Sequence, residues 1–305
     1  MSDASPAVSI NHAPTPERIL HRLDWQVIRR LDGLFQGDYR TIFYGDGIDF
    51  TDLREYQEQD DVRHIDWNVT ARMNTMYVRQ FVEDREITAW FLVDQSPSMG
   101  FGPVERSKEL VLIELVTTLA RLLTRNGNRV GAILYRDRIE RTIPPRSGRN
   151  QVLRLARELL RRTDTAVKKT TDLSVLLNAG LNTFKKRSLV FVISDFISEP
   201  GWLRALSLLS HRHELIGIRL WDPREAALPN AGLILVEDSE TGEQLFVETS
   251  DPEFRRRFLE AADRRERTLK EDLKRAGVDL FAMSNEEDLV SAIVRMAARR
   301  KKRRR

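Results

Sequence analysis

The chain has 305 residues, of which 41% are hydrophobic and 31% charged, and its formal net charge is +4. At roughly 150 residues per domain, this length predicts about two domains, or one large domain with additions. The sequence contains no cysteine, which excludes a disulfide framework, a thiolate metal site and a cysteine nucleophile. No stretch reaches the ~18 apolar residues of a membrane span, and the first residues lack the pattern of a secretory signal. We therefore expect a cytoplasmic protein.

The positive charge is concentrated at one end of the chain. Residues 299–305 are all Arg or Lys, so the rest of the sequence carries a small negative charge. A basic tail of this kind can contact nucleic acid, an acidic membrane or an acidic partner. The alternative is a solvated, disordered end, and the composition leaves both open.

The first part of the chain is predicted to form a segment of its own. Residues 1–15 are rich in Ser, Ala, Pro and Asn, which predicts a disordered N-terminus. Thr15 before Pro16 is typical of a helix start, and the apolar spacing predicts a helix to about residue 35. Residues 36–74 show no apolar period, which is uncommon inside a compact domain unless the segment is functional. We predict an irregular α+β layer over residues 16–84.

Residues 85–298 alternate apolar strands with amphipathic helices. Strands are predicted at about 87–93, 130–135, 189–193, 214–220 and 278–283. Helices are predicted at about 105–125, 150–161, 173–184, 202–209, 252–277 and 284–298. This alternation predicts an α/β, Rossmann-like doubly wound domain with a mainly parallel sheet. Ligands of such domains bind beyond the carboxyl ends of the strands.

Two features depart from the parallel pattern. Residues 138–143 predict a short edge strand that ends at Pro144-Pro145. Residues 233–237 and 244–247 flank Thr241-Gly242 and predict a β-hairpin insertion at about residues 230–250. The hairpin shows no ligand pattern, so the sequence assigns it no role.

Side chains with oxygen atoms follow two of the predicted buried strands. Asp94, Ser96 and Ser98 come directly after the first of them in an Asp-x-Ser-x-Ser pattern, and Asp195 follows a later one. Because the carboxyl ends of parallel strands meet at one edge of a sheet, we expect these groups to converge. The alternative for the first group is a capped turn that opens the next helix.

The convergence of carboxylates predicts a bound cation. Two carboxylates about 6 Å apart repel each other by roughly 3 kcal/mol at an effective dielectric constant of about 20. A divalent cation between them removes this repulsion. Oxygen donors without cysteine or clustered histidine select Mg²⁺, Mn²⁺ or Ca²⁺ over zinc or copper. Since hydroxyls are neutral ligands, such a site leaves the ion able to take an external carboxylate from a partner protein.

These residues resemble the metal-ion-dependent adhesion site of von Willebrand factor type A domains. That motif joins Asp-x-Ser-x-Ser to a distant Thr and a distant Asp. The resemblance implies a metal site formed by Asp94, Ser96, Ser98, Thr171 and Asp195. It implies that the two aspartates act mainly through water, whereas the hydroxyls contact the ion.

Three positions near the motif need comment. The resemblance favours Thr171 over Thr170, because the family threonine often precedes an acid or amide, although an ordinary N-cap remains an alternative. Lys168-Lys169 and Phe196 stand where the family commonly has glycine. The local backbone of these two loops is therefore left open by the sequence.

A second resemblance covers the segment before the α/β domain. The irregular residues include the runs 44–50, 52–56, 60–67, 71–72 and 77–79, which are similar to the bacterial family of domain of unknown function 58. Members of that family join such a segment to a von Willebrand A-like domain. They are often encoded beside MoxR-type AAA+ ATPases. The resemblance therefore implies a protein-interaction module, an adaptor or co-chaperone of such an ATPase, that uses Mg²⁺ and has no enzymatic activity of its own.

The charged residues of the N-terminal segment allow two interpretations. Arginines 54, 63, 72 and 79 can form bidentate pairs with aspartates 49, 52, 61 and 66 under the cover of Tyr56 and Trp67. This would make the segment a structural platform. The alternative is a partner or nucleotide surface formed by Asp60, Asp61, His64 and Trp67.

Two other function classes stay open. A metal-dependent phosphohydrolase would use Asp94 as nucleophile, but Ser96 stands where the dehalogenase pattern needs a second Asp, and no Walker lysine loop is present. A phosphate- or nucleic-acid-binding protein would use the basic tail. The positive runs are scattered and the aromatic side chains that would stack on bases are few, so this function is kept as the alternative and not as the main one.

Overall fold

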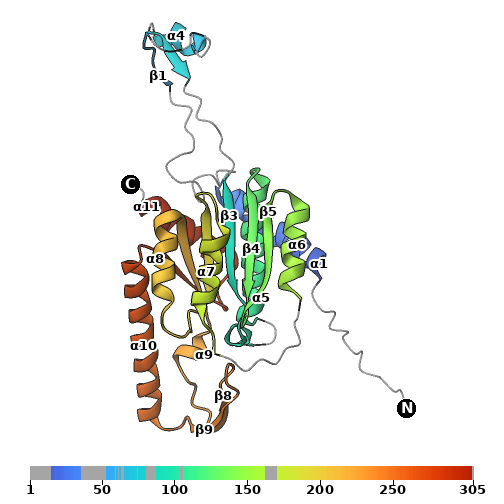
Figure 1. Cartoon of the computed structure of the whole chain (residues 1–305), viewed down its shortest axis with the longest axis vertical. Coiled ribbons are helices and arrows are strands. Elements are labelled where there is room, and N and C mark those ends of the chain that lie inside the picture. The colour runs from blue at the N-terminus through green and yellow to red at the C-terminus, as the bar shows by residue number, and fades with distance from the viewer. Residues whose placement is uncertain are drawn as a thin grey trace, which may run out of the picture.

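A central six-stranded sheet organises the main part of the molecule (Figure 1). The computed structural model describes residues 15–35, 53–58, 60, 62, 65–73, 75–79, 87–103, 106–161 and 170–303. The strand order is β10-β7-β6-β3-β4-β5, and every neighbouring pair is parallel except β4 and β5. The strands are β3 (Thr88–Asp94), β4 (Arg129–Tyr135), β5 (Ile139–Arg146), β6 (Leu189–Ser194), β7 (Glu214–Trp221) and β10 (Asp279–Ser284). The predicted α/β class with a mainly parallel, doubly wound sheet is confirmed.

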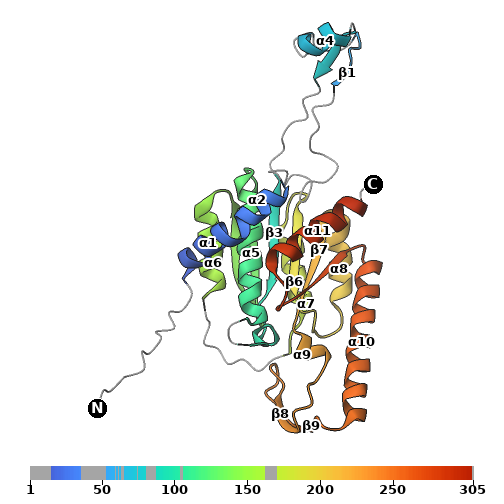
Figure 2. The ribbon, with the colours of Figure 1, turned by 180° about the vertical axis from the view of Figure 1, so that it is seen from behind.

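Helices cover both faces of this sheet (Figures 1 and 2). One face packs against α1 (Pro16–Leu23), η1 (Asp24–Ile28), α2 (Arg29–Phe35), α5 (Lys108–Arg125), α6 (Arg149–Leu159) and α11 (Leu289–Arg303). The other face packs against α7 (Leu173–Thr183), α8 (Trp202–Arg212) and the end of α10 (Pro252–Arg275). The central strands are apolar on both sides, because both faces of a doubly wound sheet are covered. Trp90 and Phe91 of β3, for example, enter opposite core clusters.

The order of the strands creates a switch point between β3 and β6. From β3 the chain moves outward through α5 to β4 and the edge strand β5, and then returns past α6 and α7 to β6 on the other side of β3. Helices that follow β3 and β6 therefore leave in opposite directions, which opens a crevice at the carboxyl ends of these two strands. Asp94 and Asp195 lie at this crevice.

The edge strand β5 is longer than the sequence predicted. Pro144 and Pro145 lie inside it rather than beyond it, and the pairing with β4 reaches Val130 opposite Arg146. The register shifts between Val130 and Ala132, next to these prolines. An edge strand tolerates proline at such an irregularity, because a missing backbone N–H there breaks no ladder on the outer side.

The N-terminal helix packs on the same core as the sheet. The helix predicted to reach about residue 35 is present, with a π-helical turn, η1, between α1 and α2. Leu20 and Leu31 are fully buried against the core of the sheet domain. Ion pairs join this helix to α5 and to the residue before α11. Arg22 contacts Glu114, and the other pairs are Asp24–Arg121 at 3.0 Å, Asp32–Arg125 at 3.0 Å and Arg30–Asp288 at 3.2 Å.

The described part of the irregular segment forms a small α+β unit. It pairs β1 (Leu53–Glu55) with β2 (Tyr77–Arg79) in antiparallel fashion and contains α4 (Trp67–Met73). Arg54 contacts Asp60, which lies in the turn next to β1. The predicted partners at positions 49, 52 and 61 lie outside the described residues. Trp67, predicted to cover the ion pairs of this segment, is 67% exposed. The N-terminal residues 1–14, the motif at 44–50 and residues 61, 63 and 64 lie outside the described residues.

The late elements include the predicted hairpin and a longer final helix. The strands β8 (Leu233–Glu237) and β9 (Gln244–Glu248) pair in antiparallel fashion, as predicted. The last helix continues to Arg303 rather than ending near residue 298. Arg300, within the predicted basic tail, is only 5% exposed and contacts Glu214 of β7. Part of the tail is therefore packed on the sheet domain.

We predict that Gly131 of β4 cannot carry a side chain. A Cβ atom there would lie 2.9 Å from the Trp90 ring and 2.9 Å from the carbonyl oxygen of Ile143. Gly131→Ala should lower the free energy of unfolding by about 1–3 kcal/mol through overpacking. Gly33→Ala is the control, because nothing lies within 4 Å of that helical position, and it should raise stability by about 0.5–1 kcal/mol. Urea unfolding followed by circular dichroism measures both, and equal shifts of the two midpoints would contradict this account.

Candidate metal site

The five residues of the predicted metal site are all buried at the switch point. Asp94 ends β3, Asp195 follows β6, and the two strands are parallel neighbours with Val93 opposite Ile193. The exposed fractions are 0% for Asp94, 2% for Ser96, 5% for Ser98, 2% for Thr171 and 2% for Asp195. Thr170 is exposed. This geometry makes Thr171 rather than Thr170 the candidate, while its contact with an ion stays a prediction.

Neutral donors hold both oxygens of Asp94. The backbone N–H of Ser96 donates to Oδ1 at 2.9 Å, and the hydroxyl of Ser194 donates to Oδ2 at 2.6 Å. The hydroxyls of Ser96 and Ser98 lie 3.1 Å apart. They are brought together because η3 (Pro97–Gly100), a 3₁₀ turn, starts immediately after Ser96. The Asp-x-Ser-x-Ser run is therefore folded into a compact group of oxygens.

The surroundings of Asp94 disfavour the charged form of its carboxyl group. Burial, and then repulsion from Asp195, raises its pKa to about 7, although the bonds from Ser194 and Ser96 act in the other direction. Burial disfavours the charged form, and a nearby like charge adds to that effect. A cation next to Asp94 would offset both the cost of burying the charge and the repulsion from Asp195.

Lys108 compensates the second aspartate. Its ammonium is fully buried, lies 2.9 Å from Oδ2 of Asp195 and also contacts Glu225. Burial by itself lowers the pKa of Lys108, but the attraction of Asp195 and Glu225 outweighs it, so the pKa is raised. Glu225 is placed by α9 (Pro223–Ala226), where it completes a capping box with Asp222. Thus Asp195 has a cationic partner, whereas the contacts of Asp94 in the described structure are with neutral groups.

The loop after Asp195 has an unusual backbone. Phe196 has φ of +59°, the left-handed region that glycine adopts most easily. Its N–H donates to Ser194 Oγ at 2.8 Å, and the N–H of Ile197 donates to Asp195 Oδ1 at 3.0 Å. The Phe196 ring packs on Trp202 with centroids 5.7 Å apart. This packing offsets part of the conformational cost of the positive φ at a position where the resemblance led us to expect glycine.

The loop that carries Thr171 is tied to the loop after Asp195. The carbonyl of Thr171 accepts from the N–H of Glu199 at 2.8 Å and from the hydroxyl of Ser198 at 3.1 Å. Asp172 caps α7, and its own N–H donates to the Tyr135 hydroxyl at 2.9 Å. The hydroxyl of Thr171 contacts Glu240, a residue of the hairpin. Lys168 and Lys169 lie outside the described residues.

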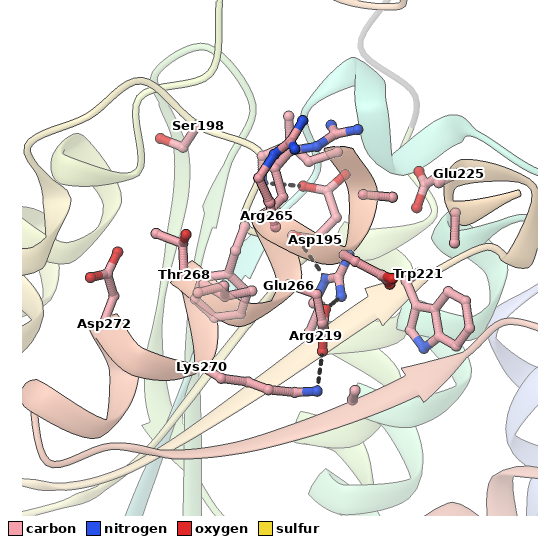
Figure 3. Close-up of a pocket in the computed structure, with 18 of the residues that line it drawn as sticks. Asp195, Ser198, Arg219, Trp221, Glu225, Arg265, Glu266, Thr268, Lys270 and Asp272 are labelled. Carbon is pink, nitrogen blue, oxygen red and sulfur yellow. Dashed lines mark hydrogen bonds and ion pairs between the residues drawn. The ribbon is translucent and has the colours of Figure 1, made fainter. Parts of the chain in front are cut away.

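Two hollows flank these residues. A hollow of about 220 Å³ is lined by Asp94, Ser96, Glu109 and Arg136, among others. A larger groove of about 980 Å³ runs from Asp195 along α10. Figure 3 shows Arg219 and Lys270 directed at Glu266 inside this groove, with Trp221 beside them. The site therefore has open space next to both aspartates.

The donor set fits a hard divalent cation. Among the described residues, no three His, Asp or Glu side chains gather in an arrangement that would hold an ion. Two carboxylates with three hydroxyls suit Mg²⁺, Mn²⁺ or Ca²⁺ and do not suit zinc. The burial of Asp94 beside Asp195, with only neutral donors in contact with it among the described residues, is the observation that favours an ion here.

The comparisons with known proteins settle the family. The family described as "Protein of unknown function DUF58" matches residues 52–268. The chain belongs to this family. An uncharacterized protein of Mycobacterium tuberculosis is 31% identical over 284 residues, which cover 93% of this chain and 89% of that protein. The resemblance expected from the sequence is confirmed.

Solved structures share the von Willebrand A-like fold of this DUF58 protein. An aerotolerance-related membrane protein from Bacteroides fragilis is similar with a TM-score of 0.49 and 17% identity, over 71% of this chain and 99% of that chain. The manganese-loaded TRAP protein of Plasmodium vivax is similar with a TM-score of 0.32 and 22% identity, over 44% and 57% of the two chains. These likenesses concern the fold.

The expected cytoplasmic location is contradicted by these comparisons. The B. fragilis protein is described as a membrane protein. A protein of Vibrio fischeri, similar with a TM-score of 0.25 and 16% identity over 70% of this chain and 98% of that chain, is described as membrane-spanning. The assignment to the cytoplasm was therefore wrong. Within the ranges that the structure describes, no helix is both long and apolar enough to cross a bilayer.

Sequence reasoning missed several residues that shape the site. Ser194 could have been noticed, since it ends β6 directly before Asp195. Lys108, Glu225 and Glu240 reach the site from distant elements and have no motif of their own. No local pattern in the sequence signals them.

We predict that the fold depends on Lys108, the buried cation that contacts Asp195 and Glu225. Lys108→Met should lower the free energy of unfolding by about 3–5 kcal/mol, because it leaves two acids without their buried cation. Urea unfolding in the presence of a chelator measures this effect without interference from metal ions. Lys270→Met is the matched control, since Lys270 forms an exposed pair with Glu266 at 3.0 Å, and a comparable loss in that variant would contradict the assignment.

Proposed function

We propose that this chain is a metal-dependent protein-interaction module in which Asp94, Ser96, Ser98, Thr171 and Asp195 hold a divalent cation that binds a carboxylate of a partner protein. The observation that carries the proposal is the burial of Asp94 beside Asp195 with no cationic contact of its own in the described structure. Mg²⁺ is the proposed ion, with Mn²⁺ and Ca²⁺ as the alternatives that the same donors accept.

Each residue has a distinct part in this proposal. Ser96 N–H and Ser194 Oγ fix the carboxylate of Asp94, so it can orient a water toward the site. Lys108 fixes Asp195 in the same way. Ser96, Ser98 and Thr171 present hydroxyls as neutral ligands. When bound, the ion supplies a Lewis-acidic position for one oxygen of an external carboxylate.

The structure offers support for an interaction role over a catalytic one. The hydroxyls of Ser96 and Ser98 bond each other, and in the described residues neither contacts a histidine that would activate it as a nucleophile. Trp67, Val62 and Met73 of the small α+β unit are more than half exposed, and exposed aromatic and apolar side chains are typical of protein interfaces. We assign no catalytic residue.

The partner is proposed from the family resemblance. Members of the DUF58 family are often encoded beside MoxR-type AAA+ ATPases, so we propose an adaptor or co-chaperone of such an ATPase, in which the ATP chemistry belongs to the partner. The hollow beside Asp94 and the groove beside Asp195 leave space for a partner segment that carries the acid.

Mn²⁺ binding tests the metal site. Isothermal titration of the metal-free protein should show one site, and Asp94→Ala should weaken it by about 10- to 100-fold, the usual effect of removing an outer-shell group. Asp263→Ala, which removes an exposed acid of α10, should bind as the original protein does. Equal affinity of all three proteins, or no binding to any, would refute the site.

Partner binding tests the bridge. The purified MoxR-type ATPase of the same organism should bind the immobilised chain in Mg²⁺, and a chelator or Asp94→Ala should each weaken this binding by at least about tenfold, which corresponds to 1.4 kcal/mol. Biolayer interferometry gives the dissociation constants. If the ATPase binds equally well in every case, the partner contact does not pass through the ion.

A further inference from the structure

The tip of the β8–β9 hairpin is a rigid turn that presents Glu240. Asp238 Oδ1 accepts from the N–H groups of Glu240 and Thr241 at 2.8 and 3.0 Å. Gly242, with φ of +70°, donates its N–H to the Asp238 carbonyl at 2.7 Å. These bonds fix the direction in which the Glu240 side chain leaves the turn.

Glu240 reaches the Thr171 loop with both carboxylate oxygens. The N–H of Thr171 donates to Oε2 at 2.5 Å, and the Thr171 hydroxyl lies 2.6 and 2.8 Å from Oε1 and Oε2. A hydroxyl that donates its hydrogen keeps its lone pairs free for a cation. Glu240 therefore contacts the candidate ligand Thr171 without blocking its ligating oxygen.

The tip is buried although the hairpin is not. Glu240 is 9% exposed, whereas Leu233, Leu245 and Phe246 of the two strands are each more than 60% exposed. A buried acid is normally paired with a cation. In the described structure the contacts of Glu240 are with neutral donors. The hairpin thus inserts a charged side chain, rather than an apolar one, at the metal site.

The insertion of Glu240 adds a second carboxylate without a cationic contact to the surroundings of Asp94 in the described structure. Tyr135 lies opposite Asp94 in the β3–β4 ladder, and its hydroxyl accepts from the N–H of Asp172, the residue after Thr171. The Thr171 loop that Glu240 contacts is therefore tied to the strand next to Asp94. Lys108 is already engaged by Asp195 and Glu225. A divalent cation held at the site would compensate Asp94 and Glu240 together.

We propose that Glu240 is an internal carboxylate ligand of the metal site, occupying the position that a partner's carboxylate takes, so that the hairpin must be displaced before the partner binds. This inference rests on the proposed metal-dependent function. An acid tethered by a short chain acts at an effective concentration in the millimolar range, so it competes with any free carboxylate. The hairpin then regulates access to the ion rather than being an insertion without a role.

Mn²⁺ relaxation of water protons tests this inference, with acetate as the carboxylate probe. Glu240→Gln keeps an amide oxygen for the Thr171 N–H but loses the charged ligand. Its Mn²⁺ complex should show a higher relaxivity, because about one more exchangeable water enters the ligand shell, and its Mn²⁺ affinity should fall by about tenfold. Acetate should then lower the relaxivity of this variant and leave that of the original protein unchanged.

Glu243→Gln is the matched control, because Glu243 lies in the same turn with an exposed side chain. It should behave as the original protein does in relaxivity, Mn²⁺ affinity and response to acetate. If Mn²⁺ binding is lost in Asp94→Ala but the Glu240→Gln and Glu243→Gln variants are alike, the internal ligand is refuted and the metal site stands. If no protein binds Mn²⁺, both proposals fail.

Hydrogen exchange gives a second readout that is independent of relaxivity. Mn²⁺ should slow exchange of the amides of residues 238–243 in the original protein, because the ion ties the tip to the site. The same residues should gain no protection from Mn²⁺ in Glu240→Gln. Equal protection in both proteins would show that the tip is held by the turn and by Thr171 alone.

Discussion

The site depends on one electrostatic constraint, which is that two parallel strands side by side end in buried aspartates. The sheet brings Asp94 and Asp195 to the same edge because β3 and β6 are hydrogen-bonded neighbours at the switch point. Neither acid can move away, since each is fixed by backbone and hydroxyl donors. The protein must therefore accommodate two buried carboxyl groups side by side, and the surrounding donors meet that requirement.

The two aspartates are compensated in different ways. Asp195 has a permanent partner in Lys108, which is part of the fold and cannot leave. Asp94 has only neutral donors in the described structure. A lysine offers a point charge that accepts no ligand, whereas a divalent ion accepts several oxygens. In the proposed site, this division places the exchangeable ligand position beside Asp94, because Asp195 is already paired with Lys108.

The sequence was sufficient for the parts of the site that follow from local pattern. Asp94, Ser96 and Ser98 could be placed because an apolar run predicts a buried strand and the turn after it is part of the motif. Lys108 and Glu240 could not, because each depends on long-range packing of elements whose sequence only shows amphipathicity or a turn. The end of β5 was predicted too early, at Pro144 and Pro145. A proline is tolerated inside a strand when the strand lies at an edge of the sheet next to an irregular register, and the sequence does not show this. The positive φ of Phe196 likewise depends on side-chain packing, here against Trp202 at the start of α8.

The hairpin is the part of the site that the apolar core holds least. Every other group at the site comes from a strand end, a helix start or a loop between them, and these are held by the core. Glu240 comes from an extension whose strands are largely exposed, so little apolar burial holds it in place. The free energy that fixes the tip is then mainly the interaction of its carboxylate with Thr171 and with whatever charge occupies the site. An ion that binds there strengthens the contact, and a competing acid weakens it, because both act on the same carboxylate position. In the proposed site, metal occupancy and hairpin position are coupled for this reason, and such a coupling is reciprocal.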